Sequence, residues 1–183
     1  MKFEKTGIEG CFVIHIERLT DERGWFSRVF SETDFKNYTG AVNFVQINHS
    51  FNSLKGTFRG LHYQAPPFSD GKLVRCISGS IIDFLFDLRT KSPSFLKCFS
   101  VDLSAKNGKM IFLPKGLAHG FQTLEDNSEL IYHHTDNYNK VGERGILYND
   151  PLVNIKLPLP ISVISEKDRG YPCLSADFKG IEV

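Results

Sequence analysis

The stretch RGLHYQAPPFSDGKLVRCISG (59–79) decides the fold, together with the shorter segment PKGLAHGF (114–121). Both segments place a histidine beside glycine and proline residues that mark tight turns. Histidine is the side chain that gains and loses a proton near neutral pH. We therefore expect these two segments to carry the chemistry of the protein.

Short runs of β-branched and aromatic residues surround these segments, with turn residues between them: 12–16, 44–51, 72–79, 80–88, 97–103, 109–113 and 129–134. Many short strands at close intervals predict a sandwich or barrel, and a double-sheet jelly roll suits this length. The best helical segment is Ser31 to Tyr38, with Ser31 as its N-cap. The proline-rich stretch 151–172 is predicted to wrap the barrel without regular structure. We expect an all-β jelly-roll barrel with a few short peripheral helices.

The chain has 183 residues and a mass of 20.8 kDa, which predicts a single domain over residues 1–183. Its net charge of +1 provides no overall field for nucleic acid or an anionic membrane, so neither is an expected partner. The sequence has no apolar signal region and no run of about 18 apolar residues. We therefore expect a cytoplasmic protein.

Segment 59–79 resembles the first signature motif of the cupin jelly-roll superfamily, which carries two histidines, a glutamate and a glycine. His62 and Gly79 match this pattern. Gln64 replaces the second histidine, and Lys72 stands where the glutamate would be. A lysine places a positive charge where a metal needs an anionic ligand. We therefore expect neither a metal nor another cofactor.

Segment 114–121 meets the second cupin motif, Pro-x-Gly-x-x-His, in full, with His119 as its histidine. The resemblance thus brings His62, Lys72 and His119 together at the mouth of a barrel. Such a set suits proton transfer next to a polarised carbonyl, because the histidine removes a carbon-bound proton and the lysine stabilises the enolate oxygen.

A closer resemblance, to the dTDP-4-dehydrorhamnose 3,5-epimerases, spans most of the chain. It rests on ERG (22–24), QINHS (46–50), GTFRGLHYQ (56–64), GKLVRC (71–76), DLRTKSPSF (87–95), LSAKN (103–107), PKGLAHGFQTLED (114–126), YNDP (148–151) and SEKD (165–168). The resemblance implies a cofactor-independent isomerase that inverts C3, C5 or both in a nucleotide-linked 4-keto-6-deoxyhexose. Such reactions serve deoxysugar and polysaccharide biosynthesis.

The resemblance also implies roles for individual residues. His62 is the base, Asp168 orients its imidazole, and Tyr132 returns a proton from the opposite face. Lys72 and His119 surround the sugar and its enolate. The implied binding residues for the nucleotide diphosphate and its sugar are Arg23, Gln46, Asn48, Arg59, Tyr138, Glu143 and Lys167.

Two positions depart from the family pattern on the nucleotide side. Arg28 stands where glutamate is usual, and Ile47 where aspartate is common. If residue 28 contacts the base, arginine donates hydrogen bonds to cytosine but cannot accept one from the N–H of the thymine ring. Arg28 therefore raises the hypothesis of a CDP-linked substrate.

Other functions stay open on the sequence alone: an epimerase acting at one carbon, a sugar-nucleotide ketoisomerase, a metal-dependent cupin and a non-catalytic sugar-binding cupin. The resemblance further implies a homodimer in which an N-terminal strand completes the partner's sheet. His133 and His134 follow Tyr132 directly and point to opposite faces of a strand, so they cannot both line the pocket, and neither is assigned a role.

Overall fold

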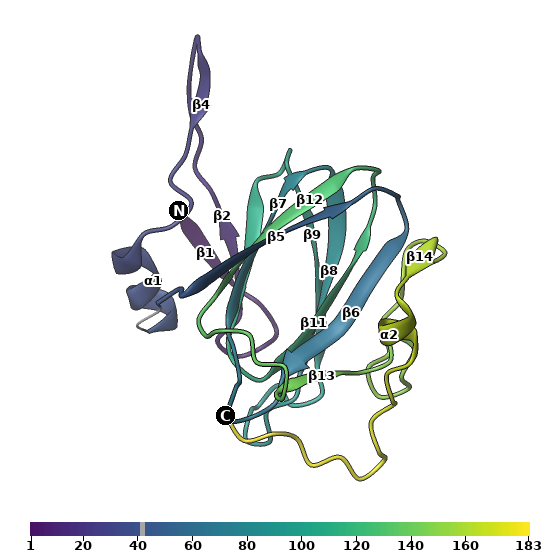
Figure 1. The fold of residues 1–183 in the computed structure, drawn as a ribbon. Coiled ribbons are helices and arrows are strands. Elements are labelled where there is room, and N and C mark those ends of the chain that lie inside the picture. The colour runs from purple at the N-terminus through teal and green to yellow at the C-terminus, as the bar shows by residue number, and fades with distance from the viewer. Residues whose placement is uncertain (41–42) are drawn as a thin grey trace.

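The computed structural model describes residues 1–40 and 43–183, and two facing sheets dominate the described chain (Figure 1). The first sheet runs through β1 (Lys2–Lys5), β2 (Phe12–His15), β10 (Lys109–Leu113), β7 (Lys72–Ser78), β12 (Ser128–His134) and β5 (Gln46–Asn52). The second runs through β13 (Glu143–Gly145), β6 (Thr57–Gln64), β11 (Leu117–Thr123), β8 (Ser80–Asp87) and β9 (Cys98–Ser104), and β14 (Val163–Ile164) pairs with β6. The all-β prediction is confirmed.

All seven predicted runs contain a strand, but the two motif segments also form strands, β6 and β11, which the sequence pattern did not indicate. Residues on both faces of β11 are buried, so it shows no polar and apolar alternation. Gly60 has φ +135°, and a Cβ there would lie 2.5 Å from Gly120 Cα. This close approach lets the two strands pair with His62 directly opposite His119.

Two short helices lie outside the sheets. The predicted helix is present as α1 (Glu32–Thr39), and the Ser31 hydroxyl accepts a hydrogen bond from the Asp34 N–H at 3.4 Å, as an N-cap does. The second helix, α2 (Glu166–Arg169), interrupts the otherwise largely irregular stretch 151–172. Over the described part of the chain, neither helix has the length and apolar character that a bilayer span requires.

A hairpin of β3 (Leu19–Asp21) and β4 (Gly24–Phe26) projects away from the barrel (Figure 1). We call residues 19–26 the arm. Its large apolar side chains are exposed, with Phe26 at 72% and Trp25 at 50% of their full accessible area. Exposed aromatic side chains on a projecting hairpin are typical of a surface that another chain covers.

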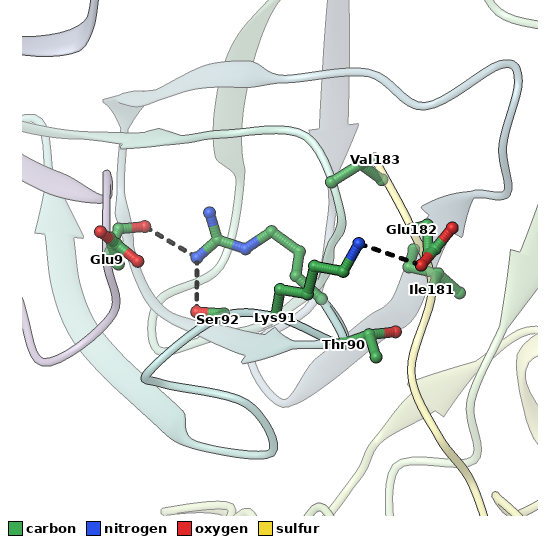
Figure 2. A pocket seen from close by; sticks show the side chains of 8 residues that line it. Glu9, Thr90, Lys91, Ser92, Ile181, Glu182 and Val183 are labelled. Carbon is green, nitrogen blue, oxygen red and sulfur yellow. Dashed lines mark hydrogen bonds and ion pairs between the residues drawn. The ribbon is translucent and has the colours of Figure 1, made fainter.

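The last residues of the chain pack beside the end of β8. The Ile181 N–H donates to the Leu88 carbonyl at 2.7 Å, and the Thr90 N–H donates to the Ile181 carbonyl at 3.1 Å. A cavity of about 510 Å³ lies here (Figure 2). The Arg89 guanidinium next to it is paired with Asp87, and Lys91 with Glu182 at 3.4 Å.

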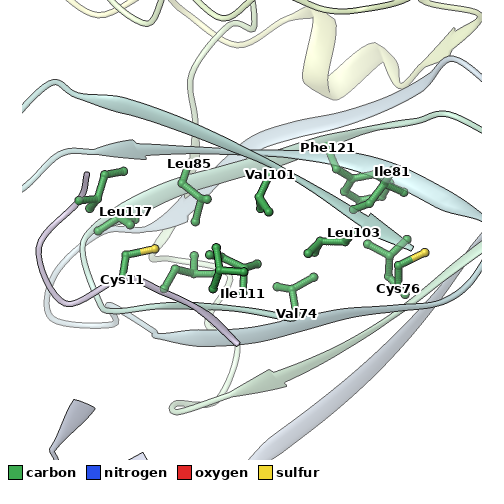
Figure 3. Close-up of a cluster of buried hydrophobic side chains, with 14 residues drawn as sticks. Cys11, Val74, Cys76, Ile81, Leu85, Val101, Leu103, Ile111, Leu117 and Phe121 are labelled. Atoms are coloured by element: carbon green, nitrogen blue, oxygen red, sulfur yellow. The ribbon is translucent and has the colours of Figure 1, made fainter. Parts of the chain in front are cut away.

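Apolar side chains from both sheets fill the barrel (Figure 3). Leu85 from β8, Ile111 from β10 and Val74 from β7 are completely buried in this cluster. Burying one such side chain contributes roughly 1.5–3 kcal/mol to folding. Tyr132 packs against the cluster from its edge, so the filled core forms the floor of a more polar cavity.

Candidate active site

A cavity of about 270 Å³ opens between the two sheets above this core. Its walls come from β5, β6, β7, β11 and β12, through Asn48, His49, Ser50, Arg59, His62, Lys72, His119, Phe121, Tyr132 and His134. The cavity beside Arg89 is larger, but its two basic side chains, Arg89 and Lys91, are already paired within the chain and it contains no histidine. We therefore place the candidate active site between the sheets.

His62 and Asp168 form a close titratable pair beside the cavity. Nε2 of His62 lies 2.7 Å from Oδ1 of Asp168, and the other carboxylate oxygen accepts the Gly60 N–H at 3.1 Å. Burial alone would raise the pKa of Asp168, but the hydrogen bonds from His62 and Gly60 outweigh it and hold that pKa below its usual range. An ionised Asp168 accepts the Nε2 proton, which leaves the Nδ1 lone pair of His62 free to act as a base.

Lys72 enters the cavity from β7 with its ammonium 3.8 Å from the Asp70 carboxylate. Both side chains are nearly buried, at 11% and 5% exposure. Burial alone would raise the pKa of Asp70, but the Lys72 charge and a hydrogen bond from His134 lower it. The ammonium therefore carries its positive charge inside the site, where a developing oxyanion gains most from it.

Tyr132 faces His62 from the other sheet, because β12 and β6 belong to different sheets. Its hydroxyl lies 3.0 Å from the Ser50 hydroxyl. Burial raises the pKa of Tyr132 well above its usual range, so the side chain is a neutral phenol that holds a proton to donate.

His119 approaches from β11, and its Nε2 lies 2.8 Å from Asp83 Oδ1, outside hydrogen-bond geometry. Both side chains are buried, at 6% and 0% exposure. Asp83 lies on the neighbouring strand β8 and is completely buried, so its carboxyl group sits directly beside the His119 imidazole.

The predicted binding residues form an outer rim next to the cavity. Arg59 is held by Asn52 Oδ1 at 2.7 Å, and Tyr138 donates its hydroxyl proton to Glu143 at 3.1 Å. Lys167 forms an ion pair with Glu143, and this contact lowers the pKa of the Glu143 carboxyl. Gln46 and Asn48 lie beside Tyr138 in an adjoining cavity of about 160 Å³.

The structure does not bring Arg23 and Arg28 to this site within one chain. Arg23 sits on the arm, where its guanidinium bonds to Asp21, and Arg28 follows the arm and lines none of the cavities around His62. Ile47 points outward from β5 and is 64% exposed. The two departures from the family pattern therefore lie outside the cavity formed by one chain.

The polar residues of the site that sequence reasoning missed include His49, Ser50, Asp70, Asp83 and His134. His134 carried a signal, since strand alternation requires that either it or His133 face the cavity. His134 does so, whereas His133 packs on the other face of the strand against Phe44. Among the described residues, no group of three or more His, Cys, Asp or Glu is arranged to hold a metal ion.

Comparison with known proteins gives a consistent result. The family model for dTDP-4-dehydrorhamnose 3,5-epimerase matches residues 5–176. A dTDP-4-dehydrorhamnose 3,5-epimerase of Shigella flexneri is 42% identical over 180 residues, which cover 97% of this chain and 99% of that protein.

Solved structures agree with this match. The crystal structure of a dTDP-4-dehydrorhamnose 3,5-epimerase from Elizabethkingia anophelis superposes with a TM-score of 0.92 at 36% identity, covering 97% of this chain and 98% of that one. A dTDP-6-deoxy-D-glucose-3,5-epimerase from Legionella pneumophila, in complex with dTDP-4-keto-L-rhamnose, gives a TM-score of 0.88 at 36% identity, covering 94% and 92%. Each of these proteins is similar to this chain over nearly its whole length.

Proposed function

The chain belongs to the dTDP-4-dehydrorhamnose 3,5-epimerase family, and from this premise we propose how it epimerises C3 and C5 of a dTDP-linked 4-keto-6-deoxyhexose in dTDP-rhamnose biosynthesis. The observation that carries the proposal is the placement of His62 and Tyr132 on the two different sheets that form one cavity. Inversion requires removal of a proton from one face of the sugar and delivery to the other. Two opposed proton carriers meet that requirement.

His62 is the proposed base. Asp168 accepts its Nε2 proton and stabilises the imidazolium that forms when Nδ1 takes a proton from the carbon next to the ketone. Lys72 and His119 stand at the enolate oxygen, where the lysine charge opposes the charge that develops. Tyr132 then donates its phenolic proton to the opposite face of the same carbon.

The outer rim is proposed to hold the nucleotide diphosphate. The planar donors of Arg59 suit phosphate oxygens, and the amides of Gln46 and Asn48 offer further N–H groups. Binding energy from this remote part of the substrate positions the reacting carbon between the base and the acid. Tyr138, Glu143 and Lys167 lie at the same rim as further proposed contacts.

We propose that a homodimer completes the binding site. Arg23 and Arg28 lie on and next to the arm, which projects from its own barrel, so they reach a nucleotide only in the cavity of a second copy (Figure 1). The exposed Trp25 and Phe26 support this arrangement. Sedimentation should give a dimer, and Phe26→Asp should yield monomers with a raised KM. A fully active wild-type monomer would contradict the dimer.

The reaction is tested by incubating the protein in heavy water with 4-keto-6-deoxyhexoses linked to dTDP, CDP or GDP, followed by mass spectrometry. Two deuterons in the dTDP sugar are expected, one at each inverted carbon. A single deuteron would indicate an epimerase acting at one carbon, and faster turnover of the CDP sugar would restore the hypothesis raised by Arg28. No deuterium with any nucleotide would refute the proposed function.

A further inference from the structure

A continuous line of four hydrogen bonds runs along the rim from Asp70 to Tyr138. His134 Nδ1 lies 2.9 Å from Asp70 Oδ2, and His134 Nε2 lies 3.2 Å from the amide nitrogen of Asn48. The Asn48 oxygen accepts from the Gln46 amide at 3.2 Å. The Gln46 oxygen accepts the backbone N–H of Tyr138 at 3.0 Å. Four of these five residues come from outside the two sequence motifs.

The two ends of this line fix its direction. The Tyr138 N–H only donates, and the Asp70 carboxylate, whose pKa is lowered by Lys72 and His134 against the effect of its burial, only accepts. Each group between them must therefore accept on its Tyr138 side and donate on its Asp70 side. For His134 this means a neutral imidazole with its proton on Nδ1, because Nε2 accepts from Asn48.

We propose that neutral His134, whose proton Asp70 fixes on Nδ1, is a positioning residue that determines which way the Gln46 and Asn48 amides face the nucleotide diphosphate. The inference rests on the proposed function, which places the diphosphate at this rim. Phosphate oxygens only accept hydrogen bonds, so the amide N–H groups must be turned toward them. The fixed direction of the line prevents either amide from rotating and presenting its oxygen instead.

Protonation of His134 breaks this arrangement. The imidazolium carries a proton on Nε2 as well, which then faces the Asn48 amide nitrogen, so two donors oppose each other. The line cannot reverse to relieve the conflict, because the Tyr138 N–H at its far end cannot accept. Substrate binding should therefore weaken when His134 gains a proton.

Several charged and titratable groups face His134 and bear on its protonation. Asp70, just before β7, favours the imidazolium, and Lys72, the first residue of β7, opposes it. The remaining groups around the same two cavities are Tyr132 on its own strand, His49 on β5, Arg59, His62 and Tyr63 on β6, His119 on β11, Tyr138 and Glu143. His133 is adjacent on β12 but lies on the opposite face of the strand. Since many groups titrate in this region, the test needs a signal from the His134 ring itself.

The first measurement is the tautomeric state of His134 in the free protein, by NMR of the full chain labelled with ¹⁵N-histidine. The His134 signals are assigned by their loss in His134→Asn. The expected result near pH 8 is a neutral ring with its proton on Nδ1. Asp70→Asn gives a second test, because the introduced amide can also donate, so the preference for Nδ1 should fall. A wild-type ring protonated on Nε2, alone or with Nδ1, overturns the inference without touching the proposed function.

The second measurement is the pH dependence of KM and kcat. Wild-type KM should rise as the pH falls through the range of about 8 to 5 in which histidine titrates. His134→Asn should have a KM raised about fivefold, the effect of about one net hydrogen bond, a flatter KM profile and a kcat within about twofold of wild type.

The matched control is His133→Asn, which changes the neighbouring histidine on the opposite face of β12 against Phe44. It should leave KM and its pH profile unchanged. Equal effects of the two substitutions, or a fall in kcat at constant KM in His134→Asn, overturn the positioning role. An inactive wild-type enzyme whose His134 ring still carries its proton on Nδ1 would refute the proposed function instead.

Discussion

Replacing Asp168 by asparagine should disable the base by changing where His62 carries its proton. The Gly60 N–H requires an acceptor at one atom of residue 168, so the oxygen of the introduced amide takes that place. The amide nitrogen then faces His62 Nε2 and donates to it. Nε2 must supply its lone pair, the proton moves to Nδ1, and the ring has no lone pair directed at the substrate.

Two losses set the size of the effect. A hydrogen bond to a charged group contributes about 1.5–3 kcal/mol, and this stabilisation of the imidazolium disappears with the carboxylate. Recovering the reactive tautomer breaks a further neutral hydrogen bond, at about 1 kcal/mol. Together these raise the barrier by about 2.5–4 kcal/mol, so kcat/KM should fall by about 10²- to 10³-fold.

The assay is the rate at which the dTDP-linked 4-keto sugar gains deuterium in heavy water, with circular dichroism to confirm folding. Asp150→Asn is the matched control, because Asp150 is also a buried carboxylate and accepts backbone N–H groups of Leu152 and Leu174 away from the cavity. Asp150→Asn should lower the free energy of unfolding but leave the rate of deuterium gain unchanged. A folded Asp168→Asn enzyme within about threefold of the wild-type rate would refute the assignment of Asp168.

Tyr132→Phe should keep proton exchange at the carbon from which His62 removes the proton but slow product formation by about 10²-fold. NMR can compare deuterium gain with product formation, and equal slowing of both would contradict the role of Tyr132 as acid. Lys72→Met should slow exchange itself by about 10²- to 10³-fold, and an unchanged rate would exclude stabilisation of the enolate by Lys72. Asp87→Asn addresses stability: burial alone would raise the pKa of Asp87, but hydrogen bonds from Arg89 and neighbouring serines lower it. The stabilisation from Asp87 is thus present above its unfolded pKa of about 3.9 and is lost as the pH falls through its lower folded pKa. Urea titration should therefore show that acid lowers the free energy of unfolding less in the variant than in the wild type. Parallel losses of stability in the two proteins would contradict this.

The sequence predicted the strands with clear alternation but not the two that matter most for the site. β9 alternates because one face meets the core and the other does not, so its pattern is visible, whereas β8 is buried on both faces over residues 83–87. β11 is buried on both faces, and β6 carries Gly60 at a position where it nearly touches Gly120, so neither strand shows a regular period. Their histidines were found through motifs rather than through periodicity.

The sequence by itself determined the reactive groups of His62, Lys72 and His119, because each belongs to a short motif whose turns and register are local. No local pattern gives their partners: family resemblance alone implied Asp168 for His62, and only the tertiary structure showed Asp70 beside Lys72 and Asp83 beside His119. Asp168 lies 106 residues from His62, and Asp70 lies 64 residues from His134. Contacts at such separations depend on which strands pair and in what register, and this follows from burial of the whole core rather than from any local pattern. The same reason explains the arm. The motif assigns Arg23 to the nucleotide side of the site, but the arm carries this residue away from the barrel of its own chain.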